Sequence, residues 1–265
     1  GDRDGDGVDN FSEHEMGSNP NSADTDGDGL LDGDEVSCVS FAAPLPWLEI
    51  STLTNLTDAI TNSYYNCISV GLPSPVTIQG IAVTNITIDA DGVVYFNREG
   101  YANPEYSRGA CDFDYSTIDT NCFTVAPYWS NLFLSDEPAP SSMRFGTAAV
   151  GTNGYYVLEC LNMYKDLNSW KTNSISFQLA FPTGQVDKVH VRYANLVGDE
   201  MDGYCASIGF QSFGAKERMS YCSWDQDMVY DGMGLSFILG YGTDPTNADT
   251  DGDGLSDGIE IDTYG

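Results

Sequence analysis

The sequence predicts an all-β fold in which an antiparallel β-sandwich lies between acidic loop repeats at both ends of the chain. Short β patterns separated by Gly, Pro, Asn and Asp run from residue 37 to 241 without helical periodicity. The chain is 41% hydrophobic and 12% aromatic, which is enough to fill a sizeable core. Residues 1–36 and 242–265 hold 19 of the 40 acidic residues. We therefore expect three units, at 1–36, 37–241 and 242–265.

An acidic segment occurs three times in the chain. Residues 17–36 align without gaps to residues 242–261, with 13 of 20 positions identical, and a weaker copy runs from Asp2 to Glu13. Each copy reads D-x-D-x-D-G-x-x-[DN]-x-x-E. Calcium takes six to eight oxygen ligands, and a twelve-residue loop supplies them from positions 1, 3, 5, 7, 9 and 12, with Gly at position 6 making the turn. A solvated acidic linker would not keep this pattern three times, so we expect at least three bound Ca²⁺ ions.

The spacing assigns six ligands to each loop. Those of the first loop are Asp2, Asp4, Asp6, the Val8 carbonyl, Asn10 and Glu13. Those of the second loop are Asp24, Asp26, Asp28, the Leu30 carbonyl, Asp32 and Glu35. Those of the third loop are Asp249, Asp251, Asp253, the Leu255 carbonyl, Asp257 and Glu260.

The flanks of these loops decide which calcium-binding family they resemble. Gly17, Pro20, Gly242 and Pro245 interrupt the helices that a full EF-hand needs. The pattern G-[ST]-[DN]-P-x-x-x-D-T-D-G-D-G-L-x-D-G-x-E instead resembles the bacterial calcium-binding repeats related to thrombospondin type 3. That resemblance implies an extended, calcium-wrapped rod with little core of its own. A dockerin is the alternative, but it would need an apolar helix after each loop, and none is visible in the sequence.

The clearest strand of the centre runs from Ser174 to Phe181, where apolar and small or polar residues alternate. A turn at 182–184 leads to a second apolar pattern at 186–196, so we expect a hairpin with one buried face. Further short runs lie at 76–79, 84–88, 92–96, 122–129, 154–163, 204–210 and 234–239. Many short strands without helices predict a β-sandwich.

A second resemblance follows from the order of these segments. VTIQGIAVTNITIDADGVVYF, FTVAPYWSNL, GYYVLECLNM, NSISFQLAFPTGQVDKVHVRYANL and ASIGF are similar to a nidogen-like extracellular β-sandwich domain over about 76–210. The resemblance implies a secreted or surface domain and names no ligand. One departure is VLEC, where Cys160 stands at a position at which Trp is common in that family.

Seven cysteines in such a chain indicate an oxidising compartment. The best local disulfide is Cys111–Cys122, followed by Cys205–Cys222 and Cys38–Cys67. Because seven is odd, at least one thiol is left over, and we assign this role to Cys160 in the core.

Three sequons could carry glycans, at Asn10, Asn55 and Asn85. Asn10 is a predicted calcium ligand and should not accept a sugar. Asn85 alternates with two isoleucines and is expected to face outward, while Asn55 lies in a Thr-rich segment.

The net charge of −30 excludes nucleic acid as a partner, because no basic footprint could neutralise its phosphates. The same charge disfavours an anionic membrane surface. The longest largely apolar stretch, residues 41–50, is far below the roughly 20 residues that cross a bilayer, so we expect no membrane span.

No pattern of catalytic residues stands out, and we expect no enzymatic activity. A cysteine nucleophile needs a histidine base within reach, but His190 is expected on the polar face of its strand while Cys160 points inward. Two histidines are too few for a zinc site. The acidic pairs that could suggest glycosidase carboxylates fall in turn-like segments, at Asp112/Asp114 and Asp136/Glu137.

Two non-enzymatic extracellular classes remain, secreted or at the cell surface. The first is a structural protein, one unit of a fibre or filament in which residues 1–36 of one copy meet residues 242–265 of the next, head to tail. The second is an adhesin or carbohydrate-binding module on a calcium-rigidified stalk, with glycans as partners. Stacking platforms in that case would come from Trp129, Trp170 and Trp224, although we expect Trp129 in the core. Repeats on both sides of the centre favour the first class.

Overall fold

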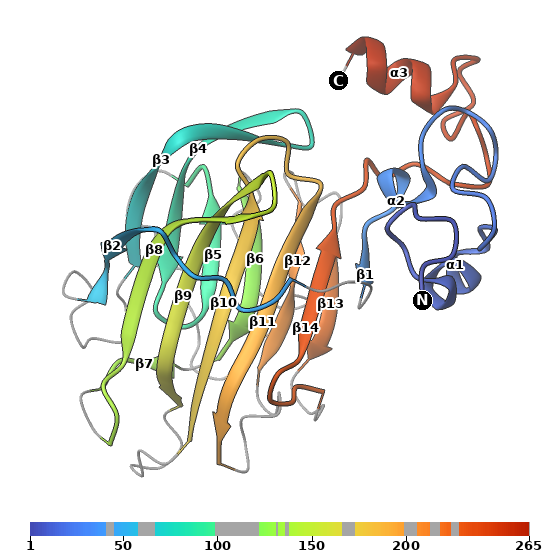
Figure 1. Ribbon diagram of the computed structural model, residues 1–265. Coiled ribbons are helices and arrows are strands. Elements are labelled where there is room, and N and C mark those ends of the chain that lie inside the picture. The colour runs from blue at the N-terminus through green and yellow to red at the C-terminus, as the bar shows by residue number, and fades with distance from the viewer. Residues whose placement is uncertain are drawn as a thin grey trace.

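The computed structural model has two antiparallel β-sheets packed as a sandwich, with the acidic loops beside them (Figure 1). It describes residues 1–40, 45–57, 67–98, 122–130, 132–135, 138–165, 173–198, 206–212, 218–223 and 228–264. The expected all-β sandwich is confirmed.

The strands of the first sheet follow a spatial order in which both chain ends lie at one edge. From that edge the order is β1 (Cys38–Ser40), β14 (Gly234–Ile238), β11 (Lys188–Val197), β10 (Ser174–Pro182), β9 (Asn153–Lys165), β8 (Ser142–Val150) and β2 (Thr52–Asn55), and β7 (Leu132–Phe133) pairs with β9. The second sheet has the order β13 (Arg218–Ser223), β12 (Ser207–Gln211), β6 (Phe123–Trp129), β5 (Val93–Phe96), β4 (Ile81–Asp89) and β3 (Cys67–Ile78). Each run predicted from the sequence overlaps one of these strands.

The predicted hairpin is formed by β10 and β11, with Leu179 opposite Val191. The expectation of one buried face holds for β11, where burial alternates, but it is wrong for β10, which is buried on both faces. The reason is a segment that lies over the outer face of the sheet. The Leu48 amide donates to Gln178 Oε1 at 2.8 Å, and Trp47 Nε1 donates to Glu159 Oε2 at 2.9 Å.

Aromatic rings from both sheets fill the space between them. Phe96 of the second sheet meets Phe181 of the first at 5.1 Å between ring centroids, and Phe210 meets Phe237 at 5.7 Å. Such ring pairs contribute beyond the area that they bury. Trp129 is 2% exposed, as predicted, while Trp170 and Trp224 lie outside the described residues.

The cysteines differ from the predicted pairing. Cys67, Cys122 and Cys160 are thiols, so Cys111–Cys122 and Cys38–Cys67 are not formed. Cys38 and Cys67 belong to different sheets, at opposite sides of the molecule (Figure 1). Cys122 Sγ instead lies 3.6 Å from Thr124 Oγ1. Cys160 is the predicted core thiol, whereas Cys111 and the side chains of Cys205 and Cys222 lie outside the described part.

The two central sequons lie in different surroundings. Asn55 is exposed on the edge strand β2. The expectation that Asn85 faces outward is wrong, because β3 and β5 flank its strand and the Asn85 Oδ1 atom is buried.

Candidate metal centres

The three acidic loops share one backbone geometry. In the first loop, the carboxylate of Asp2 accepts hydrogen bonds from the amides of Gly5 and Gly7 at 2.7 and 3.2 Å. The Val8 amide donates to Asp6 Oδ1 at 2.8 Å. The corresponding bonds recur from Gly27 and Gly29 to Asp24, from Leu30 to Asp28, from Gly252 and Gly254 to Asp249, and from Leu255 to Asp253. One loop conformation is therefore built three times.

Glycine at position 6 is required by the backbone. Gly7, Gly29 and Gly254 have φ values of +98°, +105° and +99°, in the left-handed region that side-chain-bearing residues rarely adopt. The sharp turn inferred from the sequence is thus present in each loop.

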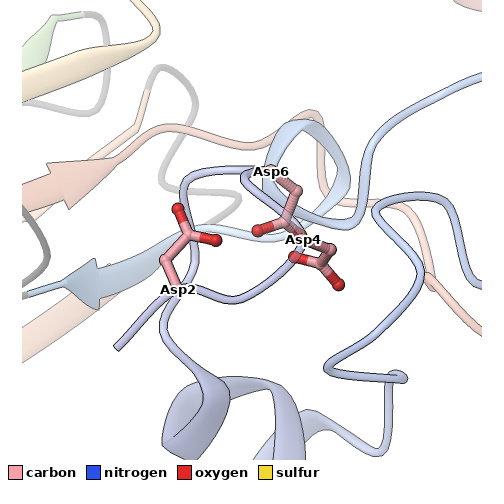
Figure 2. A group of neighbouring side chains, drawn as sticks. All are labelled: Asp2, Asp4 and Asp6. Atoms are coloured by element: carbon pink, nitrogen blue, oxygen red, sulfur yellow. The ribbon is translucent and has the colours of Figure 1, made fainter.

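The aspartates at positions 1, 3 and 5 of each loop converge. In the first loop, Asp2, Asp4 and Asp6 each place an oxygen within 4.8 Å of the others (Figure 2). The second and third loops bring together Asp24, Asp26 and Asp28, and Asp249, Asp251 and Asp253. Both oxygens of Asp4 and one of Asp6 are buried and have no hydrogen-bond partner among the described residues. Buried unpaired carboxylates are costly without a cation.

The glutamate at position 12 lies between two loops. Glu13 shares a cluster with Asp6 of its own loop and Asp32 of the second loop, and both of its oxygens are buried without a described partner. Glu35 lies in the same way beside Asp28 and Asp257 of the third loop. Position 9 therefore lies beside the preceding loop.

A threonine at position 2 holds each of these position-9 aspartates. Thr25 Oγ1 donates to Asp32 Oδ2, and Thr250 Oγ1 donates to Asp257 Oδ2, both at 2.7 Å. Asn10 and Glu260, also predicted as ligands, belong to none of the acidic clusters formed by the described residues.

A short helix begins at position 9 of every loop, which the sequence analysis missed. These helices are α1 (Asn10–Met16), α2 (Asp32–Glu35) and α3 (Asp257–Tyr264). The Asp9 side chain caps α1 by accepting from the amides of Phe11 and Ser12. With four to eight residues each, the helices are short.

Burial raises the pKa values of the carboxyls that face other carboxyls. Burial, followed by the charges of Asp4 and Asp6, raises the pKa of Glu13 to about 7. Burial is also the main cause that raises the pKa of Asp6 to about 6 and that of Glu35 to about 8. A cation that neutralises these groups would remove the repulsion. The all-oxygen donor set fits a hard divalent ion such as calcium.

The loops form a single stack, with the second loop between the first and the third. Gly33 of the second loop packs against the backbone oxygen of Asp6, and Gly258 of the third loop packs in the same way against that of Asp28. The Gly258 amide also donates to Asp28 Oδ2 at 2.8 Å. The two ends of the chain are therefore side by side, on one side of the sandwich (Figure 1).

Strand pairing explains why loops so far apart in sequence meet. β1 begins just after the second loop, and β14 ends just before the third. The two strands are antiparallel, with Cys38 opposite Ile238, so the loops leave the sheet at the same point. Beyond the strands, the amides of Tyr241 and Gly242 donate to the carbonyls of Asp34 and Glu35.

The stack is also anchored to the sandwich. Val8 of the first loop is fully buried against Ile238 of β14 and Met16 of α1. Gln79 Nε2 donates to the Gly240 carbonyl at 2.9 Å, close to the start of the third repeat. The first loop thus has a small apolar contact of its own with the centre.

The sequence analysis missed the residues that join the loops. Thr25, Gly33, Thr250 and Gly258 occupy positions 2 and 10 of the second and third loops. A signal was present, because both positions are identical in these two loops while the first loop has Arg3 and Phe11.

The remaining titratable candidates lie apart from the loops. His190 Nδ1 is 2.7 Å from Ser236 Oγ, and burial, aided by Lys188, lowers its pKa to about 4. Burial raises the pKa of the Cys160 thiol. The acidic pairs at 112/114 and 136/137 lie outside the described residues. No helix in the described part of the chain is long and apolar enough to cross a membrane.

Two family patterns match the chain. The NIDO-related pattern matches residues 41–228, and the bacterial TSP3 repeat pattern matches residues 24–38 and 249–265. No curated protein and no solved structure matches it. Both matching families are non-catalytic binding or structural domains, and they are typically extracellular. Since the first match spans more than half of its length, the chain belongs to the NIDO-related family, with bacterial TSP3 repeats on either side of the NIDO-related domain.

Proposed function

We propose that the chain is a non-enzymatic extracellular structural protein in which at least three Ca²⁺ ions hold the chain ends together as a rigid stack beside the β-sandwich. The observation that carries this proposal is the set of buried carboxylates without partners, which includes Asp4, Glu13 and Glu35. Leaving these groups charged and unpaired would destabilise the fold, whereas a bound cation stabilises it.

The proposed ligands are those given by the loop spacing, with one addition. Each loop offers its aspartates at positions 1, 3 and 5, the carbonyl at position 7 and the glutamate at position 12. Position 9 is proposed to serve the preceding loop, since Asp32 lies beside Glu13 and Asp257 lies beside Glu35.

Calcium titration with a matched pair of variants tests this proposal. Glu35→Gln removes a buried charge from the second and third loops, while Glu15→Gln removes an exposed one outside the clusters. We expect at least about a tenfold loss of affinity for one or more ions in the first variant and none in the second, since even outer-shell changes cost that much.

Limited proteolysis provides the second readout. Chelation is expected to speed cleavage between residues 1 and 36 and after residue 241, while the centre stays intact. A protein that binds no calcium at millimolar concentrations, or that is cut equally fast with and without chelator, would contradict the proposal.

We further propose that the stack is the part through which copies of the chain are built into a surface fibre or filament. Its support is that the third loop remains exposed while the first two are covered. Electron microscopy and light scattering at millimolar calcium test it. Regular polymers are expected, and particles that remain monomeric would contradict it.

A second candidate function is an adhesin or carbohydrate-binding module on a calcium-rigidified stalk. The observation that favours it is that all three loops lie on one side of the sandwich (Figure 1). Binding of the purified chain to a glycan array would support this function, and the absence of any binding would weigh against it.

A further inference from the structure

Each loop has two faces that take different roles in the stack. We call the residues at positions 5, 7 and 12 the trailing face, and those at positions 2, 9 and 10 the leading face. The leading face of the second loop covers the trailing face of the first, through Asp32 and Gly33. The leading face of the third loop covers the second in the same way, through Asp257 and Gly258.

Burial of the trailing face decreases along the stack. In the first loop, Asp6 is 6% exposed and Val8 and Glu13 are 0% exposed. In the third loop, the equivalent Leu255 is 39% exposed, Asp253 is exposed and Glu260 is half-buried. Nothing in the described residues covers the trailing face of the third loop, although its sequence matches that of the second.

A covering loop must have glycine at position 10. A Cβ atom on Gly33 would stand 2.6 Å from the Asp6 backbone oxygen, and one on Gly258 would stand 2.6 Å from that of Asp28. Real Cβ contacts are essentially never below 3.0 Å, so any side chain at position 10 would push the loops apart.

The leading face of the first loop lacks these features. Position 10 is Phe11, which is 72% exposed, and position 9 is Asn10 in place of aspartate. Position 2 is Arg3, so no threonine hydroxyl is available to hold the position-9 side chain. The first loop of a second copy therefore cannot cover the third loop in the way that the loops of one chain cover each other.

We propose that the trailing face of the third loop is a docking site for a further calcium loop with Thr, Asp and Gly at positions 2, 9 and 10, carried outside residues 1–265. Its aspartate would lie beside Asp253 and Glu260 and complete a cluster like that of Asp28, Glu35 and Asp257. This inference rests on the proposed function, because the docked loops are calcium-filled. It differs from the junction expected from the sequence, in which residues 1–36 of a second copy occupy this face.

An extended chain tests the proposal within the whole protein. A second copy of residues 18–36, which carries Thr, Asp and Gly at the three positions, is appended after Gly265. The matched control carries Phe in place of the position-10 glycine of the appended copy. A third version carries residues 1–16 instead. Calcium stoichiometry and amide hydrogen exchange of residues 253–260 are measured at millimolar calcium.

The glycine-bearing extension is expected to slow exchange at Leu255 at least tenfold, while the other two leave it unchanged. Equal exchange in all three chains, or protection by the extension with residues 1–16, would overturn the docking proposal. So would self-association of the unextended chain that Phe11→Ser abolishes, because the first loop would then be the occupant. Failure of the unextended chain to bind calcium would instead contradict the proposed function, so the two failures are distinguishable.

Discussion

Replacing Gly33 with Ala is expected to destabilise the loop stack, although the same change favours an isolated helix. Gly33 lies in the helix α2, where Ala in place of Gly contributes about 0.5–1 kcal/mol of stability. The new Cβ would stand 2.6 Å from the Asp6 backbone oxygen and 3.1 Å from Val8 Cγ2. Overpacking of this kind costs about 1–3 kcal/mol. The net expected effect is a loss of about 1–2 kcal/mol.

Native-state hydrogen exchange at saturating calcium measures this loss locally. The Val8 amide, bonded to Asp6, is expected to exchange about 5 to 30 times faster in Gly33→Ala. Gly184→Ala is the control, because a Cβ there meets nothing within 4 Å, and it should leave Val8 unchanged. If Gly33→Ala slowed or did not change the exchange of Val8, the packing of the second loop on the first would be refuted.

Three further perturbations separate the sandwich from the stack. Phe181→Ala removes a ring packed on Phe96 and should cost the sandwich about 3–5 kcal/mol in thermal or urea melts, with calcium stoichiometry unchanged. Asp251→Ala should weaken one calcium site in a titration without lowering the melting temperature of the centre, and a loss as large as that of Phe181→Ala would place the domain boundary elsewhere. For His190, the pKa falls from 6.5 to about 4 on folding, so the unfolded state binds more protons between these values. Stability should therefore fall as the pH drops from 6.5 to 4, and His190→Gln should lose that part of the slope; identical slopes would contradict the burial of this histidine.

Local patterns predicted the parts of the fold that depend on local geometry. The alternation at 174–181 identified β10, and the loop spacing identified the carboxylates that converge in each loop. Segments without such a pattern were missed. All four residues of β2 are exposed, so its sequence carries no alternation.

Non-local features could not be read from the sequence. Burial of both faces of β10 depends on Leu48, which is 130 residues away from its partner Gln178. The closeness of Cys111 and Cys122 in sequence says nothing about the direction of the Cys122 side chain. The stacking of the third loop on the second follows from the pairing of β1 with β14, which joins residues about 200 positions apart.

A crystal structure of the chain grown at millimolar calcium, with anomalous scattering recorded, tests the central claim most directly. The account predicts an anomalous peak within each aspartate triad, and contacts of Gly33 with Asp6 and of Gly258 with Asp28. Triads without peaks at saturating calcium, or a third loop that lies away from the second, would contradict it.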